Sequence, residues 1–123
     1  MKRILVVDDE SQVRELLKER LAQNKYTVMT AAGGQEALII CKAHRPDLIL
    51  LDVAMPGMDG YQACEKLKAD KETQDTPVLF LTGKDLAPQS LIERCLNLSA
   101  CGYISKLASL KEMLEKIEEI VGR

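Results

Sequence analysis

The run Leu48-Ile49-Leu50-Leu51-Asp52 places an acid directly after four consecutive apolar residues. Four residues are too few for a helix, and a segment that is apolar along its whole length is typical of a strand buried on both faces, as in a parallel sheet. An acid at the end of such a strand is costly unless it is paired or liganded. The stretch therefore predicts a central parallel strand that delivers a carboxylate to one edge of a sheet.

Similar apolar runs alternate with segments of helical periodicity along the whole chain. The predicted strands are Ile4–Val7, Tyr26–Ala31, Leu48–Leu51, Val78–Leu81 and Tyr103–Ser105. Apolar residues recur at helical spacing over 13–21, 35–43, 61–68, 88–96 and 110–121. Ser11 is the expected N-cap of the first helix, and Gly122 the C-cap of the last. Five such βα units predict an α/β fold with a doubly wound, five-stranded parallel sheet, flavodoxin-like (βα)5, in the strand order 2-1-3-4-5.

The composition limits the class of protein. A length of 123 residues predicts one domain, residues 1–123. The net charge of −2 gives no electrostatic footprint for direct nucleic-acid binding. No apolar run approaches the roughly 18 residues that cross a bilayer, and Asp8 and Asp9 interrupt the first run too early for a signal peptide. We therefore expect no membrane partner and a cytoplasmic location.

The four cysteines form neither a CxxC pair nor a zinc-finger spacing; they are Cys41, Cys64, Cys95 and Cys101. Each lies in a segment predicted to be helical or buried, so we interpret them as small hydrophobic residues of the core. Free thiols also suit a reducing compartment.

Chemically active side chains follow four of the five predicted strands, namely Asp8-Asp9, Asp52, Thr82 and Lys106. The carboxyl ends of parallel strands share one edge of the sheet, where ligands bind. Carboxylates about 4 Å apart repel by about 4 kcal/mol per pair at an effective dielectric near 20, and a hard divalent cation such as Mg²⁺ would relieve that repulsion. A carboxylate nucleophile, a metal site, a hydroxyl and an ammonium are the groups that phosphoryl transfer to an aspartate needs. Each of these residues alone has an ordinary structural explanation, such as the interaction of Asp8-Asp9 with a helix dipole. The functional signal is that all of them occur, in order, at the ends of successive strands.

Two motifs make the sequence similar to the receiver family of two-component signalling, and the resemblance covers the whole chain. Val6–Glu10 (VVDDE) resembles the first acidic motif of that family. Pro46–Gly60 (PDLILLDVAMPGMDG) resembles its phosphoacceptor strand and the following loop almost residue for residue. The resemblance implies that Asp52 accepts a phosphoryl group from a sensor histidine kinase or phosphotransfer protein.

The resemblance also implies the roles of the other site residues. The implied ligands of Mg²⁺, or of Mn²⁺ in its place, are Asp9, Asp52 and the backbone carbonyl of Ala54, with Asp8 assisting through water. The implied phosphoryl-binding and switch residues are Thr82, Lys106 and Tyr103. In the implied switch, Thr82 moves toward the phosphoryl group and the Tyr103 ring turns inward, which repacks the face of the fourth helix, fifth strand and fifth helix. That face would address an output domain or protein of unknown kind, and the domain would be a monomer that can dimerise on phosphorylation.

One residue departs clearly from the family pattern. Leu107 stands where the family usually has a proline joined by a cis peptide to the lysine before it. A cis bond without proline costs about 2.5–4 kcal/mol, so we predict a trans peptide between Lys106 and Leu107.

The sequence is compatible with three functions from different classes. The first is the phosphorylatable receiver, which acts on itself and is not an enzyme for an external substrate. The second is a degenerate receiver that only binds partner proteins, an alternative that Leu107 keeps open. The third is a phosphatase of the haloacid-dehalogenase type, which needs a second acid two residues after the nucleophile, where this chain has Ala54. A P-loop enzyme is excluded because the sequence contains no GxxxxGK[ST] motif.

Overall fold

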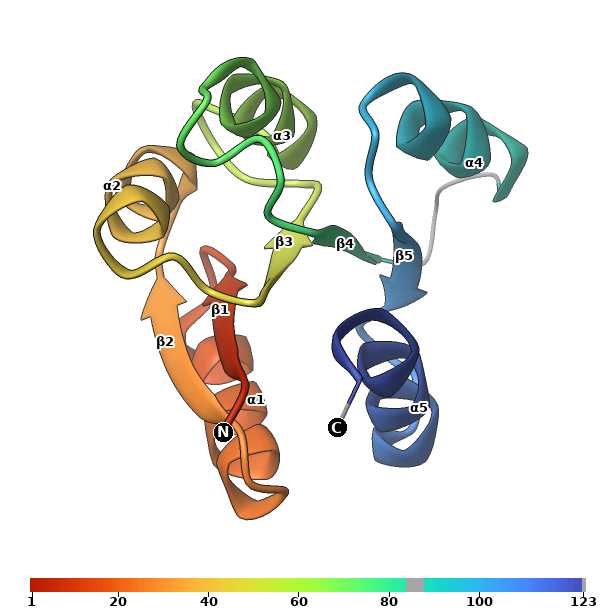
Figure 1. The fold of residues 1–123 in the computed structure, drawn as a ribbon. Coiled ribbons are helices and arrows are strands. Elements are labelled where there is room, and N and C mark those ends of the chain that lie inside the picture. The colour runs from red at the N-terminus through yellow and green to blue at the C-terminus, as the bar shows by residue number, and fades with distance from the viewer. Residues whose placement is uncertain (84–87, 123) are drawn as a thin grey trace.

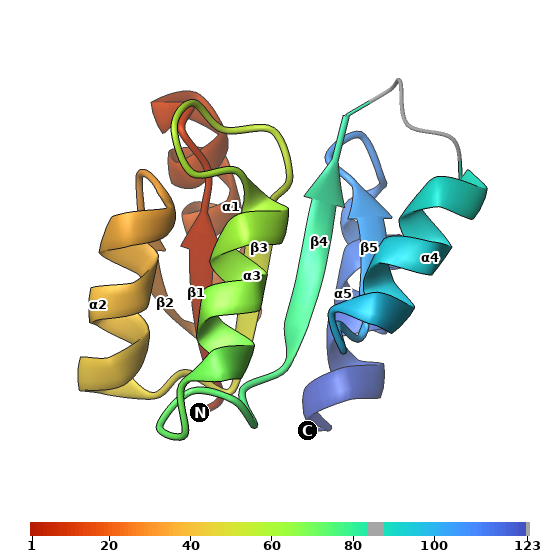
Figure 2. The same ribbon diagram turned by 90° about the horizontal axis from the view of Figure 1, so that it is seen from above.

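The computed structural model describes residues 1–83 and 88–122 and contains a five-stranded sheet in which each strand is parallel to its neighbours. The strand order is β2-β1-β3-β4-β5, which confirms the predicted topology. The strands are β1 (Arg3–Val7), β2 (Thr27–Ala31), β3 (Leu48–Asp52), β4 (Val78–Thr82) and β5 (Gly102–Ser105). Figure 2 shows β1, β4 and β5 pointing to the same edge of the sheet.

Five helices cover the two faces of this sheet. They are α1 (Ser11–Gln23), α2 (Gly34–His44), α3 (Gly60–Ala69), α4 (Pro88–Asn97) and α5 (Leu110–Val121). In Figure 1, α2, α3 and α4 lie on one face, and α1 and α5 lie on the other. Among the described residues, no helix combines the length and the apolar character that crossing a bilayer requires. The result is the expected three-layer α/β fold.

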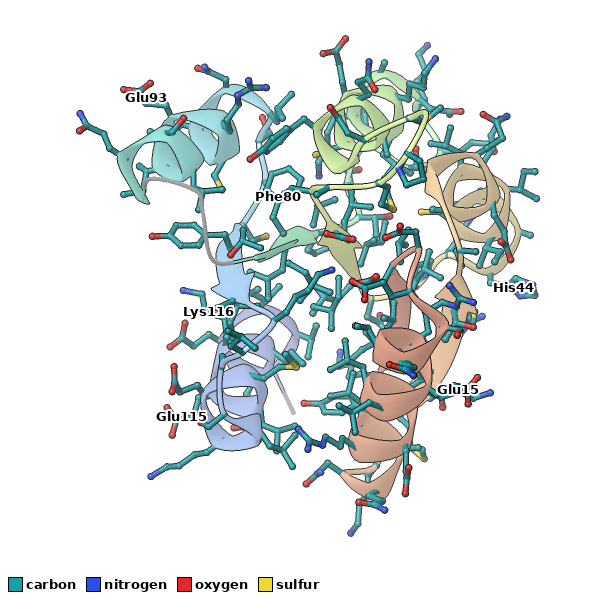
Figure 3. All side chains as sticks on the ribbon, turned by 180° about the vertical axis from the view of Figure 1, so that it is seen from behind. Glu15, His44, Phe80, Glu93, Glu115 and Lys116 are labelled. Atoms are coloured by element: carbon teal, nitrogen blue, oxygen red, sulfur yellow. The ribbon has the colours of Figure 1, made fainter. Side chains whose placement is uncertain are left out.

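The core consists of two apolar layers, one on each face of the sheet. Side chains alternate along a strand, so Leu5 packs in the layer under α2, α3 and α4, whereas Ile4 packs in the layer under α1 and α5. Phe80 on β4 is fully buried in the first of these layers, near the middle of the molecule in Figure 3. Its ring meets the Tyr61 ring of α3 edge to face, with centroids 5.2 Å apart. Burying one large apolar side chain contributes about 1.5–3 kcal/mol, so the central strands hold most of the stability.

The connection between β3 and α3 fixes the backbone that follows Asp52. Asp59 caps α3 by accepting a hydrogen bond from the Gln62 N–H, and the Gln62 side chain accepts one from the Asp59 N–H. The Gly60 N–H donates to the carbonyl of Val53 at 3.1 Å. A Cβ at Gly60 would lie 2.8 Å from the Cα of Val53, so the close approach of this helix to the strand end requires glycine.

Two predictions for single residues, Ser11 and Cys101, were wrong. Ser11 is the first residue of α1 rather than its N-cap, which is Glu10, whereas Gly122 does cap α5 as predicted. Cys101 is exposed, although the other three cysteines are buried. On α4, Leu91 and Cys95 are buried, but Ile92 and Leu96 are 49% and 76% exposed. Residues 91 and 95 share one face of the helix, and the residue after each is turned about 100° away from the sheet.

Candidate functional site

Four strands deliver the predicted side chains to one edge of the sheet. Asp8 follows β1, Asp52 ends β3, Thr82 ends β4 and Lys106 follows β5. The register pairs Asp52 with Leu81 and Thr82 with Ser105, so these strand ends are level with one another. The Lys106 N–H donates to the carbonyl of Thr82 at 2.9 Å, which extends this alignment beyond β5.

The Lys106 ammonium lies at the centre of this edge. Its Nζ is 2.8 Å from Oδ2 of Asp8, 3.0 Å from Oδ2 of Asp52 and 3.7 Å from Oε1 of Glu10. Asp8 is fully buried and Asp52 is 1% exposed, whereas the Lys106 side chain is 18% exposed. A single positive charge therefore faces two buried carboxylates. Removing one member of such a group is costly, because it leaves a buried charge without a partner.

The two buried carboxylates are held in the same way. The Glu10 N–H donates to Oδ1 of Asp8 at 2.9 Å, and the Ala54 N–H donates to Oδ1 of Asp52 at 3.1 Å. The second oxygen of each carboxylate, Oδ2, is buried and pairs with the Lys106 ammonium, which donates a charge-assisted hydrogen bond to each of them. A carboxylate oxygen has more than one lone pair, so each Oδ2 can bind a further positively charged or electrophilic ligand beside Lys106.

Burial and the neighbouring charges shift the pKa of Asp52 and of Lys106. Desolvation raises the pKa of Asp52 to about 6, against the opposing effects of Lys106 and the Ala54 N–H, and the Asp8 carboxylate adds to the rise. Burial also acts to lower the pKa of Lys106. The carboxylates of Asp8 and Asp52 outweigh that effect, so the pKa of Lys106 is raised. Lys106 is therefore positively charged at neutral pH, and Asp52 is mostly ionised there.

A group of carboxylates beside Lys106 fits a divalent cation. One oxygen each from Asp8, Asp9 and Glu10 lies within 4.8 Å of the others, and hard oxygen donors of this kind suit Mg²⁺ or Mn²⁺. The buried Oδ2 of Asp8 pairs with Lys106 and keeps a further lone pair with which it can bind such an ion. Sequence reasoning did not single out Glu10, although it is the third acid of the run. Asp52 is not part of this three-carboxylate group.

The sequence model of the family described as "Response regulator receiver domain" matches residues 4–118. The chain belongs to this family. "Response regulator MprA" of Mycolicibacterium vanbaalenii is 40% identical over 123 residues, which cover 98% of this chain and 51% of the relative. "Probable transcriptional regulator ycf27" of Cyanophora paradoxa is 39% identical over 122 residues, which cover 99% of this chain and 49% of the relative. The receiver domain thus spans about half the length of the curated relatives it matches.

Solved structures agree with the family assignment. The chemotaxis protein CheY4 of Vibrio cholerae superposes on this receiver domain with a TM-score of 0.90 at 28% identity, covering 98% of both chains. The N-terminal domain of a response regulator receiver protein from Methanoculleus marisnigri gives a TM-score of 0.80 at 36% identity, covering 100% of this chain and 98% of the other.

The remaining predicted residues lie on the β4–β5 side of the receiver site. Thr82 is 3% exposed, and its hydroxyl donates to the carbonyl of Ile104 at 3.5 Å. Tyr103 is half-buried and packs against the core layer under α2, α3 and α4. No cis peptide occurs within residues 1–83 and 88–122, which confirms the predicted trans bond between Lys106 and Leu107. Leu107 is 71% exposed, and its N–H donates to the Ser105 hydroxyl at 3.0 Å.

Proposed function

We propose that this receiver domain accepts a phosphoryl group on Asp52 from a sensor histidine kinase or phosphotransfer protein. The observation that carries the proposal is the environment of Asp52 Oδ2. This oxygen is buried and lies 3.0 Å from the Lys106 ammonium. A carboxylate oxygen held in that way is a nucleophile with a positive charge already beside it.

The chain's own residues supply the parts of the transfer. Oδ2 of Asp52 attacks phosphorus as the P–N bond to the donor imidazole breaks, and the donor histidine departs with the bonding electron pair. The Ala54 N–H holds the other oxygen of Asp52, which orients the attacking one. The Lys106 ammonium can pair with the transferred phosphoryl group, because it already lies between Asp52 and Asp8. The Thr82 hydroxyl can exchange its long contact with Ile104 for a phosphoryl oxygen.

The cofactor in this proposal is Mg²⁺, or Mn²⁺. Asp8 and Asp9 would hold it together with Glu10, or with Asp52 and the Ala54 carbonyl as the family resemblance implies. When bound, the ion would neutralise phosphoryl oxygens and offset the repulsion among the carboxylates. The domain acts on itself, through its own phosphorylation and dephosphorylation, and not on an external substrate.

The consequence of phosphorylation in this proposal is a repacking of the α4-β5-α5 face. Thr82 and Tyr103 lie on neighbouring strands, and the Tyr103 ring is only half-buried. An output domain or protein would contact this face. The domain is a monomer in this proposal and can dimerise through the same face on phosphorylation, which light scattering before and after activation tests. We place these events in the cytoplasm, because the four free thiols suit a reducing compartment.

The test is heteronuclear NMR of the domain with Mg²⁺, before and after addition of beryllofluoride, which mimics a phosphoryl group. We expect saturable shifts at Thr82, Tyr103 and Lys106 that disappear in Asp52→Asn. Asp75→Asn is the matched control, because it makes the same chemical change at an exposed position, and it should respond like the native protein. A native protein that shows no response, while remaining folded, would overturn the proposal and favour a module that only binds partners.

A further inference from the structure

The three-carboxylate group of Asp8, Asp9 and Glu10 lies in one short segment between β1 and α1. Asp8 is fully buried, whereas Asp9 and Glu10 are exposed. The Asp8 N–H donates to the carbonyl of Ala31 at 3.2 Å, and the Glu10 N–H donates to Oδ1 of Asp8 at 2.9 Å. Because the side chains of Asp9 and Glu10 are exposed, their positions depend mainly on the backbone of this segment.

Arg14, in the first turns of α1, contacts both ends of the segment. Nη1 of its guanidinium donates to the carbonyl of Asp8 at 2.7 Å, and its backbone N–H donates to the carbonyl of Glu10 at 3.2 Å. Asp8 is fully buried, so its carbonyl is shielded from water and needs a donor from the protein. The side chain of Arg14 thus fixes the point where the chain leaves β1, and its backbone fixes the point where the chain enters α1.

The charge of Arg14 strengthens the hydrogen bond to the Asp8 carbonyl. Arg14 is half-buried, and it forms no ion pair with a carboxylate among residues 1–83 and 88–122. A hydrogen bond from an ionised donor is shorter and stronger than one between neutral groups, and the 2.7 Å distance agrees with that. The guanidinium therefore acts on the backbone of the acidic segment and not as the partner of a surface acid.

We infer that the Arg14 side chain is a positioning residue for the divalent cation. By fixing the Asp8 carbonyl, it keeps the three carboxylates together before the ion binds; one oxygen of each already lies within 4.8 Å of the others. Groups that orient metal ligands without touching the metal typically contribute about 10–100-fold to its affinity. This inference rests on the metal site of the proposed function and not on phosphorylation of Asp52.

The charge of Arg14 also has an opposing effect, because a guanidinium near the site repels a divalent cation. Loss of positioning would weaken Mg²⁺ binding, whereas loss of this repulsion would strengthen it. Arg14 is only half-buried, so solvent and salt screen the repulsion. Water does not replace the hydrogen bond to the buried carbonyl in the same way. Positioning is therefore the larger of the two effects.

The experiment is a heteronuclear NMR titration of the full chain with magnesium chloride. Arg14→Met removes both the donor and the charge, and we expect the Kd for Mg²⁺ to rise about tenfold. Arg14→Gln removes the charge but keeps an N–H donor, so it should bind Mg²⁺ more tightly than Arg14→Met does. Arg20→Met makes the same chemical change at an exposed position of the same helix and should bind Mg²⁺ like the native protein.

Hydrogen exchange separates positioning from a general loss of stability. In the metal-free domain, the Glu10 amide should exchange faster in Arg14→Met than in the native protein. The amides of β3 report global unfolding, so their exchange should change by a smaller factor. Equal factors at Glu10 and in β3 would mean that Arg14 only stabilises the fold, and would overturn the inference.

The titration also distinguishes this inference from the phosphoacceptor role of Asp52. An Arg14→Met variant that binds Mg²⁺ as tightly as the native protein, or more tightly, would overturn the inference, and so would an equal loss in Arg20→Met. A native protein that binds no Mg²⁺ would overturn the metal site and this inference with it. If the native protein binds Mg²⁺ and Arg14→Met binds it more weakly, but neither responds to beryllofluoride, only the phosphoacceptor role fails.

Discussion

The centre and the far end of the sheet's functional edge are built differently. At the centre, Asp8 and Asp52 follow strands whose side chains are almost completely buried, and Lys106 joins their charges. At the far end, Ile92 and Leu96 of α4 are exposed and Tyr103 of β5 is half-buried. Regions with few buried apolar contacts open and shift at the lowest free energy. The paired charges of Asp8, Asp52 and Lys106 thus lie where burial is greatest, and the proposed moving parts lie where burial is least.

The largest expected effect comes from Leu50→Ala in the central strand. Leu50 is fully buried, so the truncation should lower the free energy of unfolding by about 2–5 kcal/mol through lost transfer energy and a residual cavity. Urea denaturation of the metal-free protein measures the change. Ile39→Ala, on an exposed position of α2, is the control and should stay within about 0.5 kcal/mol of the native protein. Equal losses in the two variants would contradict the view that the centre holds the stability.

Asp52→Asn should change how the stability of the metal-free domain depends on pH. The pKa of Asp52 rises from 3.8 to about 6 on folding, mainly through burial, so below pH 3.8 the carboxyl costs nothing. As pH rises through 3.8 and then 6, the folded state holds its proton longer than the unfolded state, and stability falls by up to about 3 kcal/mol. Denaturation between pH 4 and pH 8 in the presence of a chelator should show this fall in the native protein and a flatter profile in the variant. Parallel profiles in the two proteins would mean that ionisation of Asp52 does not lower the stability of the folded state.

Lys106→Met tests the shared charge at the centre of the site. The substitution leaves Asp8 and Asp52 buried without their common cation, and breaking a fully buried pair costs about 3–5 kcal/mol. Because Asp52 can take up a proton and Lys106 is partly exposed, we expect a smaller loss, about 2 kcal/mol at pH 7. Mg²⁺ should stabilise this variant against urea more than it stabilises the native domain, since no ammonium competes with it. Lys111→Met, at an exposed position of α5, should show neither effect; equal Mg²⁺ stabilisation in the native domain and Lys106→Met would contradict the shared-charge interpretation.

The sequence predicts the central strands and the position of Asp52 better than it predicts the contacts of α4 and of Glu10. Runs such as Leu48–Leu51 leave no polar face, so both the parallel sheet and the placement of Asp52 at its edge follow from the pattern. By contrast, the helical spacing of Leu91, Ile92, Cys95 and Leu96 does not reveal that only one stripe of α4 contacts the sheet. Glu10 was missed for a related reason, because its distance from Lys106 depends on side-chain orientation and not on sequence order. Contacts such as these depend on the tertiary structure and leave no periodic pattern in the sequence, so they could not be predicted from it.

The smallest expected effect is that of the double variant Ile92→Ser with Leu96→Ser on the outer face of α4. Both side chains are substantially exposed, so the variant should lose at most about 1 kcal/mol, chiefly from the weaker helix propensity of serine. Leu91→Ala on the inner face of the same helix should cost more, because Leu91 is 3% exposed. Urea denaturation of the two variants side by side makes the comparison within one element. A double variant as unstable as Leu91→Ala would mean that α4 is packed on both sides, and the contrast between a dense centre and a thin margin would then not hold.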